Sequence, residues 1–117
     1  MNKPTILVTG ALGHIGSALI RALPKQISCN KIILLDNLST CRYPSLFNLP
    51  KDINYIFKEY DVRNDLTSLV DDSIDYVVHL AALTEPKLSQ EQPDNFIKYN
   101  EKATRNILKF SEEKSAR

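Results

Sequence analysis

The stretch ILVTGALGHIG (residues 6–16) decides how this sequence folds, because it holds Gly10, Gly13 and Gly16, the only glycines among 117 residues. At average usage a chain of this length would contain about eight. The preceding TILVT (5–9) is apolar and β-branched, which is typical of a buried strand. After it, apolar residues from Ile15 to Leu23 follow a helical period that we expect Pro24 to end. The glycines therefore form a G-x-x-G-x-x-G turn between a first strand and a first helix.

The same alternation continues along the chain. KIILLD (31–36) predicts a second buried strand, a third lies within 53–62, and a fourth covers 74–82. We expect a short helix around 43–49, another from Asn64 or Asp65 to about Val70, and a long one over 94–114. This order predicts an α/β fold: an incomplete, Rossmann-type doubly wound parallel sheet of about four strands in the order 3-2-1-4. Strand 76–82 would then be an open apolar edge, through which the chain is expected to self-associate.

The overall composition excludes several classes of function. With 15 basic and 14 acidic residues the net charge is +1, so nothing favours nucleic acid or an anionic membrane as partner. No apolar run is long enough to span a bilayer. Cys29 and Cys41 form neither a CxxC pair nor part of a histidine cluster, so we predict no metal site. A reducing, cytoplasmic setting is the expectation.

The position of the glycine turn points to phosphate binding. A phosphate at a helix N-terminus meets free N–H groups and a partial positive charge, and glycines let it approach. Asp36 ends the second strand 20 residues after Gly16, where a carboxylate can accept hydrogen bonds from ribose hydroxyls and favours NAD. Arg42 in the following loop is the residue that could instead serve NADP. A plain strand–helix turn without a ligand is the alternative.

Several motifs occur in an order typical of one superfamily: TGALGHIG (9–16), LLDNLST (34–40), DVRN (61–64), VVHLAA (77–82), SQEQP (89–93) and YNEKATRNIL (99–108). With them the chain resembles the N-terminal part of an extended short-chain dehydrogenase/reductase. The closest group is the NAD-dependent epimerases and dehydratases of nucleotide sugars, of which UDP-glucose 4-epimerase-like enzymes are an example. The resemblance covers nearly the whole chain.

The resemblance implies which residues would contact the dinucleotide. The pyrophosphate would lie against the glycine turn, the adenosine ribose at the end of the second strand, the adenine after the third, and the nicotinamide ribose after the fourth. In that order the residues are Gly10, Gly13, His14, Ile15, Gly16; Asp36, Asn37, Ser39, Thr40; Asp61, Val62; Leu80, Ala81, Ala82, Leu83; and, beneath the cofactor, Asn100. For Asn100 a purely structural role is an equal alternative. His79, in a buried strand, is expected to be a core histidine rather than a catalytic one.

The superfamily's proton chemistry needs a tyrosine followed four residues later by a lysine, which lowers the tyrosine pKa. None of the five tyrosines here is followed by lysine at that spacing, so we predict no catalytic residue. The resemblance implies that the Tyr-x-x-x-Lys region and the substrate domain lie further along a longer protein. Residues 1–117 would then be the N-terminal part of its NAD(P)-binding domain.

Two functions are consistent with these observations. In the first, the chain is the NAD-binding portion of a nucleotide-sugar epimerase or dehydratase, not competent alone, whose longer protein takes a sugar nucleotide. In the second, it is a non-catalytic dinucleotide-binding module or a redox-sensing relative. Whether this chain is itself an enzyme is undecided. The sheet edge or the 94–114 helix is the expected surface for self-association.

Overall fold

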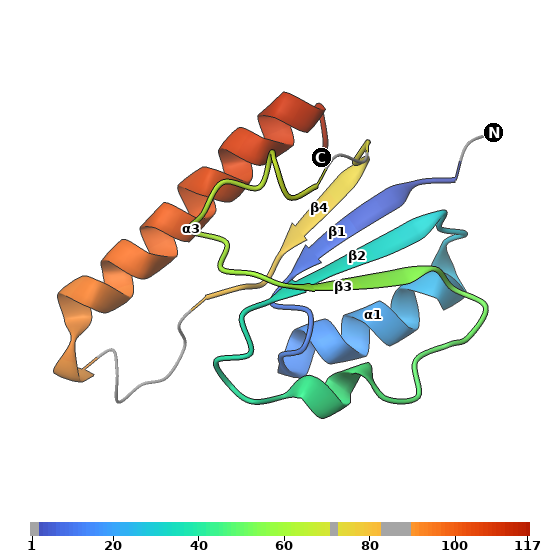
Figure 1. Cartoon of the computed structure of the whole chain (residues 1–117), viewed down its shortest axis with the longest axis horizontal. Helices are drawn as coiled ribbons and strands as arrows, with labels where there is room; N and C mark the ends of the chain where they lie inside the picture. The colour runs from blue at the N-terminus through green and yellow to red at the C-terminus, as the bar shows by residue number, and fades with distance from the viewer. Residues whose placement is uncertain (1–2, 71–72, 83–89) are drawn as a thin grey trace.

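The computed structural model describes residues 3–70, 73–82 and 90–117. Its elements are β1 (Thr5–Thr9), α1 (His14–Gln26), β2 (Lys31–Asp36), the 3-10 helix η1 (Tyr43–Leu46), β3 (Tyr55–Glu59), β4 (Tyr76–His79) and α3 (Pro93–Lys114). All strand pairs are parallel, and the sheet order is β3-β2-β1-β4, as predicted. Figure 1 shows α1 on one side of this sheet and α3 on the other.

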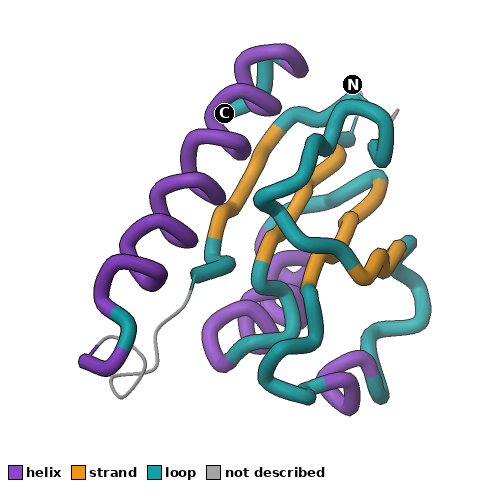
Figure 2. Tube along the Cα trace, turned by 60° about the vertical axis from the view of Figure 1, so that its left-hand side comes forward, coloured by secondary structure: helices purple, strands orange, loops and turns teal. Residues whose placement is uncertain are grey.

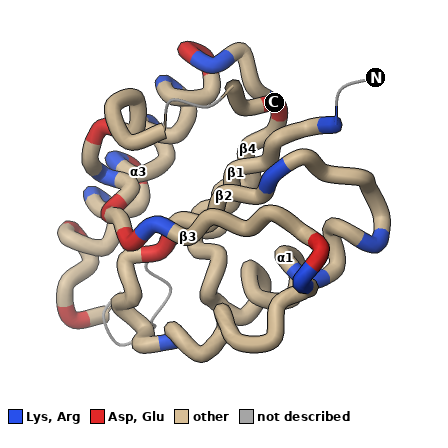
Figure 3. Tube along the Cα trace, turned by 45° about the vertical axis from the view of Figure 1, so that its right-hand side comes forward, with Lys and Arg blue, Asp and Glu red and all other residues tan. Residues whose placement is uncertain are grey.

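The two central strands are buried on both faces because their side chains alternate between two cores. Leu7, Ile33 and Leu35 pack with residues of α3 such as Ile107 and Phe110. Their neighbours along the strands face α1 and pack with its Ile20; these are Ile6, Val8, Ile32 and Leu34. Figure 2 shows the strands between helices on either side, and Figure 3 shows charges of both signs along α3. Continuous apolar strands are what a doubly covered parallel sheet requires.

Helix α1 does not end at Pro24, contrary to the sequence prediction. Proline lacks an N–H, so it cannot donate to the carbonyl four residues earlier, which is that of Ile20. The hydroxyl of Tyr55 donates to this carbonyl instead. The helix continues to Gln26, and the Ile27 N–H donates to the Leu23 carbonyl at 2.9 Å. A tertiary contact therefore compensates for the proline.

The predicted helix from Asn64 or Asp65 to Val70 does not form. The side-chain amide of Asn106, on α3, donates to the carbonyls of Val62 (2.8 Å) and Asn64. The Asp65 carboxylate accepts the Thr67 N–H at 2.9 Å and so caps a single turn, in which the Val70 N–H donates to the Leu66 carbonyl at 3.0 Å. The segment makes only this one turn before Val70.

Other boundaries differ less from the predictions. Helix α3 begins at Pro93, one residue before the predicted start, and η1 is shorter than the helix expected around 43–49. Strand β4 is shorter than predicted, and its edge is not fully open. Arg117 donates its N–H to the Asp75 carbonyl (3.0 Å) and accepts the Val77 N–H (2.6 Å). No helix among the described residues is long and apolar enough to cross a membrane.

Candidate functional site

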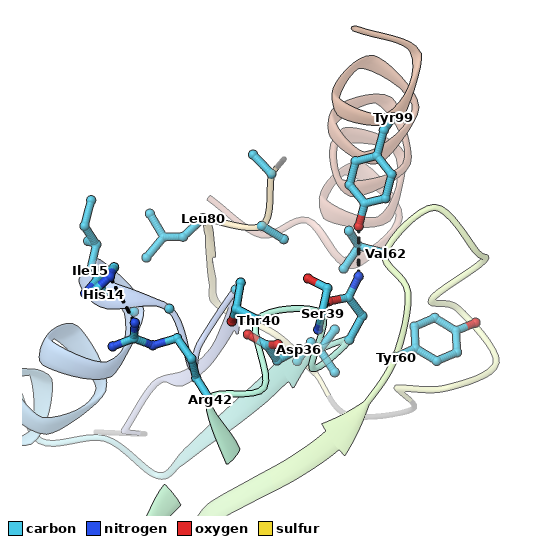
Figure 4. Close-up of a pocket in the computed structure, with 17 residues that line it drawn as sticks. His14, Ile15, Asp36, Ser39, Thr40, Arg42, Tyr60, Val62, Leu80 and Tyr99 are labelled. Carbon is cyan, nitrogen blue, oxygen red and sulfur yellow. Dashed lines mark hydrogen bonds between the residues drawn. The ribbon is translucent and has the colours of Figure 1, made fainter. Parts of the chain in front are cut away.

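A pocket of about 520 Å³ opens at the carboxyl ends of the strands, where ligands bind in parallel α/β sheets (Figure 4). Its walls come from the glycine turn, the end of β2 and the loop after it, the segments that follow β3 and β4, and α3. The lining residues are Gly10, Gly13, His14, Ile15, Gly16, Leu35, Asp36, Asn37, Ser39, Thr40, Arg42, Tyr60, Val62, Leu80, Ala81, Ala82 and Tyr99. The volume is within the range usual for small-molecule sites.

The three glycines of the turn have different reasons to be glycine. Gly10 has φ +64°, and a Cβ there would lie 2.7 Å from the Ala81 nitrogen. A Cβ on Gly16 would lie 2.2 Å from the Gly10 carbonyl oxygen, so the fold itself requires both glycines. Gly13 has φ −70°, and its Cβ would meet only the Gly10 oxygen, at an ordinary 3.4 Å. Nothing among the described residues excludes a side chain at Gly13, which faces the pocket.

The N-terminus of α1 contributes hydrogen-bond donors to the pocket. The helix begins at His14 with Gly13 as its N-cap, no side chain of the described residues caps it, and its first turn contains no acid. The first N–H groups of a helix have no intrahelical partner and carry a partial positive charge. Because His14, Ile15 and Gly16 line the pocket, this end of the site suits a phosphate.

Asp36 links the end of β2 to the glycine turn. Its Oδ2 accepts the Leu12 N–H at 3.1 Å, and its Oδ1 accepts the Leu38 N–H at 2.8 Å. A carboxylate oxygen can accept more than one hydrogen bond, so each retains capacity for a ribose hydroxyl. Ser39 and Thr40, both exposed, bring hydroxyl groups to the same part of the pocket (Figure 4).

Val62 and Tyr99 form the wall farthest from the glycine turn (Figure 4). Tyr60 also lines this end, but its ring points away from the pocket, and its hydroxyl donates to the Asp65 carbonyl at 2.5 Å. The Tyr99 hydroxyl accepts a hydrogen bond from the Asn37 amide at 3.1 Å, which joins α3 to the loop after β2. Burial, followed by the charge of Asp61, raises the pKa of Tyr99. Flat and apolar side chains at this end suit a planar base.

Asp61 does not line this pocket, although the resemblance placed it against the adenine. Its carboxylate accepts hydrogen bonds from the Arg63 guanidinium, the shortest at 2.6 Å, and these hold the pKa of Asp61 below its usual range. The Arg63 guanidinium also lies 4.4 Å from the centroid of the Tyr99 ring. Asp61 thus belongs to a side-chain cluster with Arg63 and Tyr99.

The floor of the pocket is held by a hydrogen-bond network under Leu80 and Ala81. Both N–H groups donate to the buried Thr9 hydroxyl oxygen, at 3.0 and 3.1 Å. The Thr9 hydroxyl proton therefore points to Nδ1 of His79, 2.7 Å away. Nδ1 must then accept, which makes His79 neutral with its proton on Nε2, and burial lowers its pKa. His79 thus has a hydrogen-bond partner, but it is only half buried, because β4 is a partly exposed edge strand and not the buried strand that the sequence predicted.

Two further predicted residues are not among those that line this pocket. Leu83 lies outside the described residues, and Asn100 is a half-buried residue of α3 that is not among the lining residues. The sequence patterns gave Leu35, Tyr60 and Tyr99 no role in ligand binding, and indicated Arg42 only as an alternative. Tyr60 adjoins the predicted Asp61, and Tyr99 precedes Asn100, so neighbouring motif positions were the available signal.

The sheet order and the turn after its first strand define the class of protein, a Rossmann-type α/β domain. The chain belongs to the NAD dependent epimerase/dehydratase family, whose model matches residues 6–117.

Individual relatives agree with this assignment. The UDP-glucose 4-epimerase of Mycoplasma pneumoniae is 36% identical over 91% of this chain and 31% of its own length. An epimerase structure from Methanothermobacter thermautotrophicus matches with a TM-score of 0.82 and 31% identity, over 98% of this chain and 33% of that one. The structure of the Thermus thermophilus UDP-glucose 4-epimerase in complex with NAD matches with a TM-score of 0.72 and 26% identity, over 95% of this chain and 34% of that one. The chain therefore spans about a third of these relatives.

Proposed function

We propose that this chain binds NAD and forms the cofactor-binding portion of a nucleotide-sugar epimerase or dehydratase. The observation that carries the proposal is Gly13, where the fold leaves room for a side chain but the sequence has none. The gap faces the uncapped N-terminus of α1 inside the pocket. A pyrophosphate resting on this turn explains both features.

The other parts of the pocket fit the rest of a dinucleotide. Asp36, with Ser39 and Thr40, would hold the adenosine ribose, and the carboxylate favours the free 2′-hydroxyl of NAD. The adenine would lie toward Val62 and the Tyr99 ring. The segment Leu80–Ala82 would pass beneath the nicotinamide half, since small side chains there permit close approach.

A bound NAD would accept a hydride in its oxidised form and donate it in its reduced form, while the protein binds and orients the cofactor. The residues described above would bind and orient the dinucleotide. The 117 residues contain no Tyr-x-x-x-Lys motif to move the substrate proton. We therefore assign this chain cofactor binding, and we assign the chemistry on a sugar nucleotide to a longer protein of the relatives' length.

A second candidate is a dinucleotide-binding module without catalysis of its own. The two candidates share the same pocket and differ in the coding sequence beyond Arg117. A Tyr-x-x-x-Lys motif within about 60 further residues supports the enzyme, because that length completes one domain. A stop codon directly after Arg117 supports the module.

Calorimetric titration of NAD into the folded chain tests the binding that both candidates share. We expect saturable binding with one NAD per chain, and weaker binding of adenosine because it lacks the phosphates. Circular dichroism in the same buffer establishes that the protein is folded. No heat of binding at millimolar NAD, with the chain folded, would overturn the proposal. Tighter binding of NADP than of NAD would contradict the role of Asp36.

A further inference from the structure

A second cavity, of about 340 Å³, lies between α3 and the segment that follows β3. That segment passes beside α3 (Figure 1), where the Asn106 side-chain amide donates to the Val62 carbonyl at 2.8 Å. The described residues that line the cavity are Arg63, Asn95, Lys98, Tyr99 and Lys102. Of these, only Tyr99 also lines the pocket assigned to the dinucleotide, so the second cavity is a separate candidate site.

This cavity collects positive charge from two elements. Lys98 and Lys102 are four residues apart on α3, so they lie on one face of the helix, and Arg63 comes from the segment after β3. Asp61 pairs with Arg63, and its pKa is lowered mainly by the hydrogen bonds from Arg63 and also by the charge of Lys102. Three positive charges and one negative charge leave this group with a net +2, in a chain whose total is +1.

Among the described residues, no carboxylate forms an ion pair with either lysine of the cavity. Asp94 stands one turn before Lys98 on α3 but does not pair with it. Arg105 on the same helix shows the contrast, because it pairs with Glu101 at 2.8 Å. Like charges four residues apart destabilise a helix, so the spacing of Lys98 and Lys102 opposes helix formation. An anion bound between them would remove this repulsion.

Arg63 retains hydrogen-bond donors for such an anion. Its Nη2 donates to Asp61 at 2.6 Å, and its Nε donates to both carboxylate oxygens at 3.1 Å. The guanidinium lies 4.4 Å from the centroid of the Tyr99 ring, so the carboxylate and the ring hold it beside the cavity. Its Nη1 makes no hydrogen bond to a described residue. A guanidinium has five N–H donors in a planar fork that matches the oxygens of a phosphate.

The charge and the volume indicate the class of ligand. A phosphate monoester carries about −1.5 to −2 at pH 7, which matches the net charge of the cluster, whereas a carboxylate carries a single charge. The cavity is within the size range of small-molecule sites. We propose that it binds a phosphorylated small molecule, whose phosphate lies between Arg63, Lys98 and Lys102. Binding here does not depend on the proposed function, because the two cavities share only Tyr99 among their described residues.

The test is a titration of the ¹⁵N-labelled chain with inorganic phosphate and with glycerol 3-phosphate, followed by NMR at constant ionic strength. The amides of Asn95, Tyr99 and Lys102 should shift saturably, with a Kd of about 10 mM or tighter. Shifts around Gly13 report the dinucleotide pocket and are fitted separately. Lys102→Gln should weaken binding at the cavity by about fivefold or more, because a charge-assisted contact is lost. The control is Lys109→Gln, which removes the same charge from an exposed position of α3 outside the cavity and should change the affinity less than about twofold.

Three results would overturn the proposal. The first is the absence of saturable shifts around the cavity with either probe, and the second is binding of inorganic phosphate but not of glycerol 3-phosphate. The third is equal weakening by Lys102→Gln and Lys109→Gln, since the general charge of α3 would then attract the anion. Thermal melts give an independent reading: phosphate should raise the melting temperature of wild type more than that of Lys98→Gln/Lys102→Gln. None of these results affects the NAD titration, which tests the other pocket.

Discussion

The pocket is built in two different ways at its two ends. At the glycine turn the backbone makes the site: a positive φ at Gly10, a close approach at Gly16 and the open N-terminus of α1. At the far wall, side chains from separate segments contact one another: Asn37 donates to the Tyr99 hydroxyl, and the Arg63 guanidinium lies over the Tyr99 ring. The glycine end of the pocket is therefore determined mainly by local sequence, whereas the far wall depends on tertiary contacts.

The largest expected effect is on the backbone-built end. Gly16→Ala would place a Cβ 2.2 Å from the Gly10 oxygen, and backbone atoms on both sides cannot yield cheaply. We expect the free energy of unfolding to fall by about 3 kcal/mol or more, or folding to fail. Urea denaturation measures this. Wild-type stability in Gly16→Ala would show that the turn is not built as described.

The next effect concerns the floor between β1 and β4. Thr9→Val removes the acceptor of the Ala81 N–H and the partner of His79 Nδ1 while keeping the shape of the side chain. Leaving buried polar groups unpaired should lower the free energy of unfolding by about 2 kcal/mol. The exposed Thr104→Val on α3 is the matched control and should stay within about 0.5 kcal/mol of wild type. Equal stability of the two variants would refute the network.

The same network predicts a dependence of stability on pH. Burial lowers the pKa of His79 in the folded state, so the unfolded state takes up its proton first as the pH falls. The free energy of unfolding should be constant above the ordinary histidine pKa of about 6.5 and decrease below it. His79 is half buried, so solvent screening keeps its pH-dependent contribution to the free energy of unfolding below about 1 kcal/mol. Denaturation between pH 7.5 and 5 should show a shallower decrease for His79→Gln; an identical decrease would contradict the prediction.

The smallest effect is expected at the side-chain-built wall. Tyr99→Phe removes the hydrogen bond from Asn37 but keeps the ring beneath Arg63. Loss of one partly buried hydrogen bond should lower the free energy of unfolding by about 0.5–1 kcal/mol. Tyr76→Phe, on an exposed side chain, controls for removal of a hydroxyl. A loss comparable with that of Gly16→Ala would erase the distinction between the two ends.

The same distinction explains which parts of the fold the sequence could predict. The bounds of β1 and β2 and the sheet order follow from continuous apolar runs, and the structure confirms them. The extension of α1 past Pro24 could not be predicted, because it depends on the Tyr55 hydroxyl from β3. The missing helix before Val70 depends in the same way on Asn106 of α3.

In the site, too, local features could be predicted from the sequence and tertiary contacts could not. Most residues that the resemblance implied lie together in the pocket, since glycine spacing and strand ends are local features. Tyr99 reaches the pocket because α3 packs beside it, and its partner Asn37 comes from the loop after β2. No period or spacing encodes which side-chain partners meet across separate elements.

The substitution Gly13→Ala tests whether this position is glycine because of a bound pyrophosphate and not because of the fold. The fold gives a methyl group room at this position, so the free energy of unfolding should change by less than about 1 kcal/mol. The methyl group would occupy the space proposed for the pyrophosphate, so NAD affinity should fall by about tenfold or more. Calorimetric titration and urea denaturation of the same preparation measure both quantities. A stable Gly13→Ala protein that binds NAD as tightly as wild type would contradict the account.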